Sequence, residues 1–310
     1  MSRAGRATLA IVGTGRLAAA LAAAAAASRW PVAVVAGRRR QPIAEVKRTA
    51  RAACGTRSPA RAARLGEVVL LAVTDDAIES VAQRLAEANV EFAERVVLHH
   101  AGALGPEALA PLARRGAAVG VLHPLQALGS GRGPVGLLRG ARVRIEGHAR
   151  AVAVARRLAR AFGMVPLRLT RQLGARDRVA YHAAASLASN DLVALFATAI
   201  EVFESIGTTR GEAIAALTPL VRATLEQLAA AGPRGALTGP VARGDVETLE
   251  RHLDELPRRV PEAAEIHRVL SLRLLAIAER LHPGQASEAR RRIRRLLDPV
   301  RAGRRRGPAV

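Results

Sequence analysis

Short apolar runs alternate with amphipathic stretches over the first half of the chain. The runs are rich in Val, Ile, Leu and Ala, and each stretch between them is long enough for a helix. This alternation is typical of a parallel sheet covered by helices. We therefore predict an α/β, doubly wound, mostly parallel sheet over residues 1–170. Its strands are expected at 8–12, 32–36, 68–73, 95–99, 117–122, 141–145 and 165–169, and its helices at 16–27, 43–53, 76–87, 106–114 and 149–161.

The pattern changes after Thr170, where the strand signal stops. Long Ala- and Leu-rich stretches with helical periodicity extend from about residue 177 to 281, interrupted by a Gly- and Pro-rich segment at 232–244. We predict an all-α domain over 171–285. The last segment, 286–310, is dominated by arginine and is expected to be a basic, disordered tail.

A glycine motif follows the first predicted strand. Gly13, Gly15 and Ala18 match the G-x-G-x-x-G/A pattern between a buried strand and a helix, within one β-α-β length. In this context glycine permits a tight turn and a close approach of the backbone to a pyrophosphate at the helix N-terminus. The alternative is an unoccupied glycine turn. The residues expected to contact a dinucleotide here are Gly13, Thr14, Gly15, Arg16 and Leu17.

The end of the second predicted strand distinguishes between cofactors. It reads Gly37-Arg38-Arg39-Arg40 and contains no carboxylate for a ribose 2′-hydroxyl. Guanidinium groups bind phosphate with charge-assisted hydrogen bonds, so Gly37, Arg38 and Arg39 favour NADP over NAD. The alternative is that these arginines have no role in cofactor binding and reflect the general abundance of arginine in the chain. Lys47 is the single lysine among its 48 basic residues.

The strand at 68–73 leads into Thr74, Asp75 and Asp76. Val73, Thr74 and Asp76 are expected beside the nicotinamide half of the cofactor, at the carboxyl end of the sheet. A structural interpretation is also open, because Asp76 and Glu79 have the spacing of a capping box.

Histidines follow two neighbouring strands. His99 and His100 end one strand and His123 follows the next, so all three are placed for proton transfer or substrate contact. Packed or capping histidines are the alternative. The spacing of these residues does not match a metal site.

A polar stripe lies near the start of the helical half. His182, Ser186, Ser189 and Asn190 share roughly one helix face, and the chain's single tyrosine, Tyr181, precedes them. We expect this face to contact the substrate, although a hydrogen-bonded helix contact would have the same pattern. The Gly- and Pro-rich interruption adds Thr238, Arg243 and Asp245 as candidate substrate contacts, with Arg243 a clamp for a carboxylate; an ordinary surface Arg–Asp pair is the alternative.

Composition limits the remaining classes of function. The formal net charge of +22 suggests nucleic-acid binding, but the arginines are spread along the chain and aromatic residues are only 2%. Nucleic acid is therefore expected at most as a weak contact of the tail. Cys54 is the single cysteine, which excludes an intramolecular disulfide. The longest apolar run, 17–27, is about half a membrane span, so we expect a cytoplasmic protein without a membrane partner.

Five segments together carry a resemblance to a known family. VTDDAI, HHAGALG, HPLQ, YHAAASLASN and ALTGPVARGD resemble a bacterial subfamily of Rossmann-like oxidoreductases whose C-terminal part is a domain of unknown function. The wider group includes ketopantoate reductase, pyrroline-5-carboxylate reductase and prephenate dehydrogenase, with a helical domain similar to that of 6-phosphogluconate dehydrogenase. The resemblance covers residues 7–281, and the last two segments are its most specific part.

The resemblance implies hydride transfer between NADPH and a small carbonyl or imine substrate bound between the two domains, and a homodimer joined through the helical domains. Ketopantoate reductases and β-hydroxyacid dehydrogenases have a lysine at the start of the long helix as proton donor. This chain has Tyr181 and His182 there, so His182 with Asn190 could replace the usual lysine–asparagine pair, and His182 or His123 is the expected proton donor. A non-catalytic NADP-binding sensor or partner-binding protein is the alternative.

Overall fold

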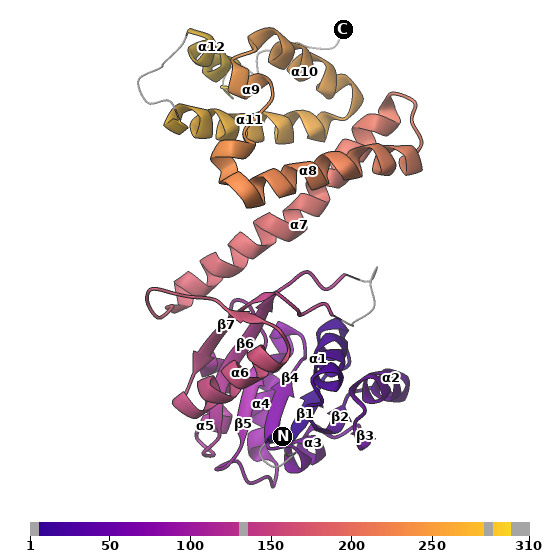
Figure 1. Cartoon of the computed structure of the whole chain (residues 1–310), viewed down its shortest axis with the longest axis vertical. Helices are drawn as coiled ribbons and strands as arrows, with labels where there is room; N and C mark the ends of the chain where they lie inside the picture. Colours follow the sequence, from indigo (N-terminus) through magenta and orange to yellow (C-terminus); the bar gives the residue numbers. More distant parts are fainter. Residues whose placement is uncertain (1–5, 130–135, 282–287, 299–310) are drawn as a thin grey trace. The chain divides into compact units, whose positions relative to one another are not determined.

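The computed structural model of the chain describes residues 6–129, 136–281 and 288–298. The chain divides into two compact units, residues 1–189 and residues 190–310 (Figure 1). The sequence places the change from sheet to helices at residue 170. The last strand of the first unit ends at Pro166, and the division between the units falls inside a long helix that begins at Ala175.

The first unit is built on one eight-stranded sheet with the strand order β3-β2-β1-β4-β5-β6-β7-β8. All neighbouring strands are parallel except β6 and β7, so the predicted mostly parallel sheet is confirmed. One short strand, β3, was not predicted because its Cys-Gly-Thr sequence has no apolar run. The strands are β1 Leu9–Val12, β2 Val32–Ala36, β3 Cys54–Thr56, β4 Val68–Leu71, β5 Val96–His99, β6 Ala118–Leu125, β7 Arg142–Gly147 and β8 Val165–Pro166.

Helices cover both faces of this sheet (Figure 1). Alternate residues of β1 point to opposite faces, so Leu9 and Ile11 pack with α1, α2 and α6, whereas Ala10 and Val12 pack with α3, α4 and α5. The helices are α1 Arg16–Ala27, α2 Arg40–Ala50, α3 Pro59–Leu65, α4 Ile78–Glu87, α5 Ala110–Ala113 and α6 Ala149–Ala161, with short 3₁₀ turns η1 Asp75–Ala77 and η2 Pro106–Leu109.

The second unit is helical, as predicted. Its helices are the C-terminal part of α7 Ala175–Ser205, then α8 Arg210–Ala236, α9 Pro240–Arg243, α10 Val246–Arg259, α11 Pro261–Leu281 and α12 Glu288–Leu296. Its principal core contains Val241, Leu249, Leu275, Ile293 and Leu297.

Residues 288–298 depart from the expectation of a disordered tail. They include α12, which buries Ile293, and Leu297 directly after it, in the core of the second unit. Glu288 also forms ion pairs with Arg291 and Arg295, which reduces the repulsion among the arginines of this helix. The other residues of the predicted tail, 286–287 and 299–310, lie outside the described part of the chain.

Helix α7 is unusually apolar for its exposure. It has 31 residues, and Ile200 is the single residue of the helix that is buried. Within the described residues, α7 alone is long and apolar enough to cross a membrane by length and composition, and 6% of its apolar window is buried. One such helix is weak evidence for a membrane span, because helices that are covered in soluble assemblies have the same composition.

Candidate functional site

The turn after β1 requires glycine at its first position. Gly13 has a φ of 129°, and its N–H donates to the carbonyl of Ala36 over 2.8 Å. A Cβ at this position would lie 2.0 Å from the carbonyl oxygen of Ala72. The turn therefore brings β1 close to the end of β4, which no other residue type would permit.

The start of α1 is open to a ligand. Gly15 is the N-cap of this helix, and a Cβ on it would meet no atom within 4 Å. The first turn of α1 contains no acidic residue, and Ala18 is fully buried against the sheet. Free N–H groups at a helix N-terminus attract anions, so this geometry fits the pyrophosphate of a dinucleotide.

Three arginines follow β2 beside this turn. Arg38 and Arg39 are exposed and form no ion pair within the described residues, and α2 begins at Arg40. A Cβ on Gly37 would lie 2.5 Å from the Thr14 side chain, so the arginine segment and the glycine turn are packed together. The guanidinium groups of Arg38 and Arg39 are therefore available to bind a phosphate near the glycine turn.

The segment after β4 does not form the capping box that the sequence suggests. Thr74 is the N-cap of η1, and Asp75 and Asp76 are exposed. The capping box between Asp76 and Glu79 is absent, because η1 shifts the N-cap of α4 to Ala77, which has no side chain that can cap. The carboxylate of Asp76 is not used by the cap, and the role of Val73, Thr74 and Asp76 beside a cofactor stays a prediction.

Three of the predicted site residues meet at the ends of β5 and β6. His123 Nδ1 lies 3.0 Å from the Tyr181 hydroxyl, and the His123 and His182 rings are 6.4 Å apart. Gly102, in the turn after β5, fits closely between the two histidines. A Cβ on Gly102 would lie 2.5 Å from His182 Nδ1 and 3.1 Å from His123 Nε2.

A buried arginine that the sequence reasoning missed supports this cluster. Arg144 of β7 pairs in register with His123, and its side chain is fully buried. Its Nη2 donates to the carbonyls of Ala101, Gly102 and Leu104 over 3.0, 3.1 and 2.9 Å. Its guanidinium carbon also lies 5.4 Å from the centroid of the Tyr181 ring.

Two carboxylates extend this arginine into a chain of ion pairs. Arg144 Nη1 bonds to Glu146, whose other oxygen accepts from Arg178 Nε over 2.9 Å. Arg178 also donates to Glu107 over 2.6 Å. The apolar neighbours of Arg144 in β7, Val143 and Ile145, were the one signal in the sequence that it stands within a buried strand.

Burial shifts the pKa of two members of the cluster, His123 and Tyr181. Burial, followed by the charge of Arg144, lowers the pKa of His123 to about 3. Burial raises the pKa of Tyr181. At neutral pH His123 is therefore a neutral imidazole and Tyr181 keeps its proton.

His99 and His100 have mainly structural contacts. His99 Nε2 lies 2.8 Å from the Gly105 carbonyl, and His99 Nδ1 accepts from the N–H of Ala101 over 3.2 Å. His100 Nδ1 bonds to the carbonyl of Leu122, and burial lowers its pKa to about 4. Both histidines hold the turn that contains Gly102.

The other predicted substrate residues are divided between the two units, with Ser186 in the first unit and Asn190, Thr238, Arg243 and Asp245 in the second. Ser186 and Asn190 follow on α7, and Thr238 and Arg243 are in the second unit. Asp245 caps α10, because it accepts from the N–H and the hydroxyl of Thr248 over 3.1 and 2.8 Å. These bonds lower the pKa of Asp245.

Comparisons with known proteins match both halves of the chain. Residues 2–124 match a Rossmann-like domain, and residues 141–274 match a domain of unknown function, DUF2520. No curated protein matches the chain.

Several solved structures have the same fold. A protein assigned as an NADP oxidoreductase from Bacteroides fragilis is 19% identical with a TM-score of 0.69, over 87% of this chain and 98% of that one. A pyrroline-5-carboxylate reductase from Coxiella burnetii is 14% identical with a TM-score of 0.56, over 89% and 98%. A reductive aminase from Aspergillus terreus, solved with NADPH and ethyl levulinate, is 16% identical with a TM-score of 0.59, over 94% and 99%. The chain thus combines a Rossmann-like domain with a DUF2520 domain, in a fold that it shares with these three proteins.

Proposed function

We propose that this protein is an NADP-dependent oxidoreductase that transfers hydride between NADPH and a small carbonyl or imine substrate. The observation that carries the proposal is the glycine turn of Gly13 and Gly15, which leaves the N-terminus of α1 open to a pyrophosphate. The histidine and tyrosine cluster lies at the same, carboxyl edge of the sheet, where ligands of doubly wound folds bind. The proteins that share the fold include NADP-linked reductases, which supports the same class.

The residues present fit the proposed cofactor. Gly13, Thr14, Gly15, Arg16 and Leu17 would hold the pyrophosphate at the start of α1. Gly37, Arg38 and Arg39 would hold the 2′-phosphate, and Val73, Thr74 and Asp76 would border the nicotinamide. NADPH would supply the hydride.

Within the chain, Tyr181 and His182 are the groups suited to supply the proton. His123 is neutral at neutral pH, so we assign it to orienting the Tyr181 hydroxyl through their 3.0 Å hydrogen bond. Arg144, 5.4 Å from the Tyr181 ring, would stabilise the negative charge that develops when Tyr181 gives up its proton. We propose the residues Ser186, Asn190, Thr238, Arg243 and Asp245 for substrate binding, with Arg243 the contact for a carboxylate.

Titration with NADPH and NADH, followed by nicotinamide fluorescence at fixed salt, tests the cofactor assignment. We expect selective NADPH binding, and Arg38→Ala should weaken NADPH at least tenfold more than NADH. Arg48→Ala is the matched control, because Arg48 is an exposed arginine in the last turn of α2. Equal losses for both cofactors in Arg38→Ala would refute the 2′-phosphate role, and no binding of either cofactor would refute the function.

Oxidation of NADPH with 2-keto acids and cyclic imines tests the reaction. Tyr181→Phe and His182→Ala should each lower turnover by about 10²- to 10⁴-fold, the usual contribution of a general acid, with NADPH affinity intact. A variant that retains turnover would remove its residue from the mechanism. Saturable NADPH binding without turnover of any candidate would favour a sensor instead.

We also propose that the protein is a homodimer joined through its helical unit. Exposed apolar side chains lie on the part of α7 in this unit and on α8, including Val193 and Leu220 with 69% and 63% of their surface exposed. Large apolar side chains in this number are typical of a surface that a partner covers.

A further inference from the structure

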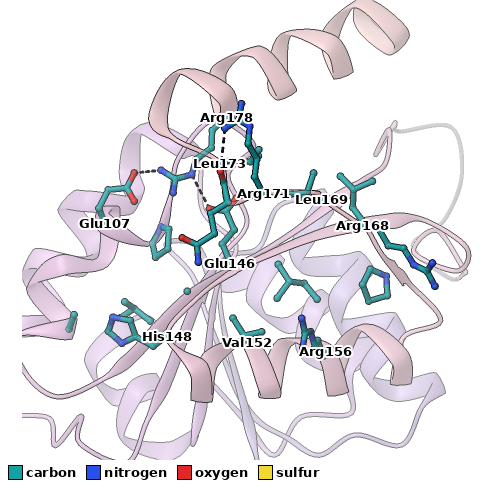
Figure 2. A pocket seen from close by; sticks show the side chains of 18 of the residues that line it. Glu107, Glu146, His148, Val152, Arg156, Arg168, Leu169, Arg171, Leu173 and Arg178 are labelled. Carbon is teal, nitrogen blue, oxygen red and sulfur yellow. Dashed lines mark hydrogen bonds and ion pairs between the residues drawn. The ribbon is translucent and has the colours of Figure 1, made fainter.

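A cavity of about 1000 Å³ lies on the outer side of β7, away from the proposed cofactor site. It is bounded by η2 and α5, by the start of α6, and by the segment 166–173 that leads to α7 (Figure 2). The strands β4, β5 and β6 separate β7 from β1, so β7 lies about 19 Å from the strand that carries the glycine turn, at ordinary strand spacing. Its size is that of a pocket for a small organic molecule.

The cavity exists because β8 covers only part of β7. Strand β8 pairs with Arg142 and Val143, and the last backbone bond between these segments runs from the N–H of Leu167 to the carbonyl of Val143. Beyond this point the chain leaves the sheet. Ile145, Glu146 and Gly147 of β7 therefore line the cavity instead of a neighbouring strand.

The walls are apolar over much of their area. The side chains of Val119, Ile145 and Val152 line the cavity from β6, β7 and α6, and Leu167 and Leu169 close it from the segment before α7. Such walls would bury the hydrocarbon part of a ligand.

Two arginines of the cavity form no ion pair in the part of the chain that the structure describes. The carboxylates of Glu107 and Glu146 are bound by Arg178, and Arg171 is paired with Asp177. Arg156 and Arg168 also line the cavity, and neither forms an ion pair within the described residues (Figure 2). The cavity therefore has guanidinium groups in excess, at positions where an anion would be bound by charge-assisted hydrogen bonds.

The first turn of α6 also favours the binding of an anion in the cavity. His148 is the N-cap of this 13-residue helix and makes no capping hydrogen bond with its side chain. His148, Val152 and Arg156 follow one another at intervals of four residues, so one face of α6 lines the cavity from its N-terminus onward. This end of the helix supports negative charge and would act together with Arg156.

We propose that this cavity binds a small organic anion, with its carboxylate, sulfonate or phosphate held by Arg156 and Arg168 and its apolar part against Val152 and Leu169. No residue proposed above to hold the cofactor or to supply the proton lines this cavity, although the cavity shares Glu146 and Arg178 with the ion-pair chain of Arg144. It does not depend on the protein being an oxidoreductase.

The test uses 8-anilinonaphthalene-1-sulfonate, an apolar anion whose fluorescence rises on binding, with the full-length chain at fixed ionic strength. We expect saturable binding of one molecule per chain, displacement by octanoate, and no displacement by 1-octanol or by inorganic phosphate. Arg156→Ala and Arg168→Ala should each weaken binding about tenfold, the loss expected for one charge-assisted hydrogen bond. Val152→Trp should weaken it as well, because the larger side chain would occupy the space proposed for the apolar part of the ligand.

Arg160→Ala is the matched control, because Arg160 is an exposed arginine one turn further along α6 that does not line the cavity. It should bind the dye as the unaltered protein does. Equal affinity in Arg156→Ala, Arg168→Ala and Arg160→Ala would overturn the proposal. Displacement of the dye by NADPH would overturn it as well, because the dye would then occupy the cofactor site. Circular dichroism confirms that each variant is folded.

Discussion

Replacement of Arg144 by methionine tests whether the buried charge supports the cluster. Methionine keeps an apolar stem of similar length but loses the ion pair with Glu146 and the bonds to three carbonyls in the turn 101–104. Breaking a buried ion pair costs about 3–5 kcal/mol, and each carbonyl left unpaired adds to that cost. Glu146 keeps Arg178 as a partner, so we expect the free energy of unfolding to fall by about 3–5 kcal/mol and not by more.

Thermal unfolding measures the effect. At about 2–4 °C per kcal/mol for a unit of this size, the variant should unfold about 6–20 °C below the unaltered protein. The control is Arg150→Met, which removes an arginine with a similar set of contacts, to Glu94 and to two carbonyls, from a side chain that is 40% exposed. That change should lower the free energy of unfolding by less than about 1 kcal/mol.

Titration of His123 by NMR gives a second, independent measurement. The charge of Arg144 is one cause of the low pKa of His123, so Arg144→Met should raise that pKa above about 3, while burial keeps it below 6.5. Equal stability of the Arg144 and Arg150 variants, together with an unchanged pKa of His123, would refute the role assigned to Arg144.

Three further predictions concern other parts of the molecule. The pKa of His100 is about 4 in the folded protein against an ordinary 6.5, so unfolding takes up a proton between these pH values and stability falls as the pH decreases. Between pH 6 and 4.5, the free energy of unfolding measured in urea should therefore change with pH by about 1.4 kcal/mol per pH unit less in His100→Asn than in the unaltered protein. An unchanged dependence on pH would contradict this account. Gly15→Val should weaken NADPH at least tenfold without loss of thermal stability, because its side chain would enter the open space before α1; unchanged affinity would place the cofactor elsewhere. Val193→Glu should convert a dimer to a monomer in light-scattering measurements, whereas a protein that is monomeric before the change would refute the proposed dimer.

The sheet could be predicted from the sequence because its strands are buried on both faces. The runs at β1, β2 and β4 are almost wholly apolar, and helices with clear periodicity separate them. Strand β3 contains no such run. Its place is determined by pairing with β2, which is a tertiary contact that local pattern does not record.

The candidate site could be predicted only in part. The glycine turn has a local signature, and the strand ends placed His123 near the site. The contact between His123 and Tyr181 joins residues 58 positions apart and depends on the start of α7. The burial of Arg144 depends on carbonyls 40–43 positions away, and nothing in its own segment indicates them beyond two apolar neighbours.

The reversed direction of β7 has a consequence for the distribution of charge around the sheet. In doubly wound proteins the helix that follows each parallel strand returns to the opposite edge, so ligands collect at a single edge of the sheet. Because β7 runs antiparallel to β6, the chain leaves it at the amino edge, and α6 starts there rather than at the edge where α1 starts. The positive ends of two helix macrodipoles therefore lie at opposite edges of one sheet. A single strand reversal thus places the positive end of a helix at each edge of one domain, so that an anion can be attracted at both edges of the same sheet.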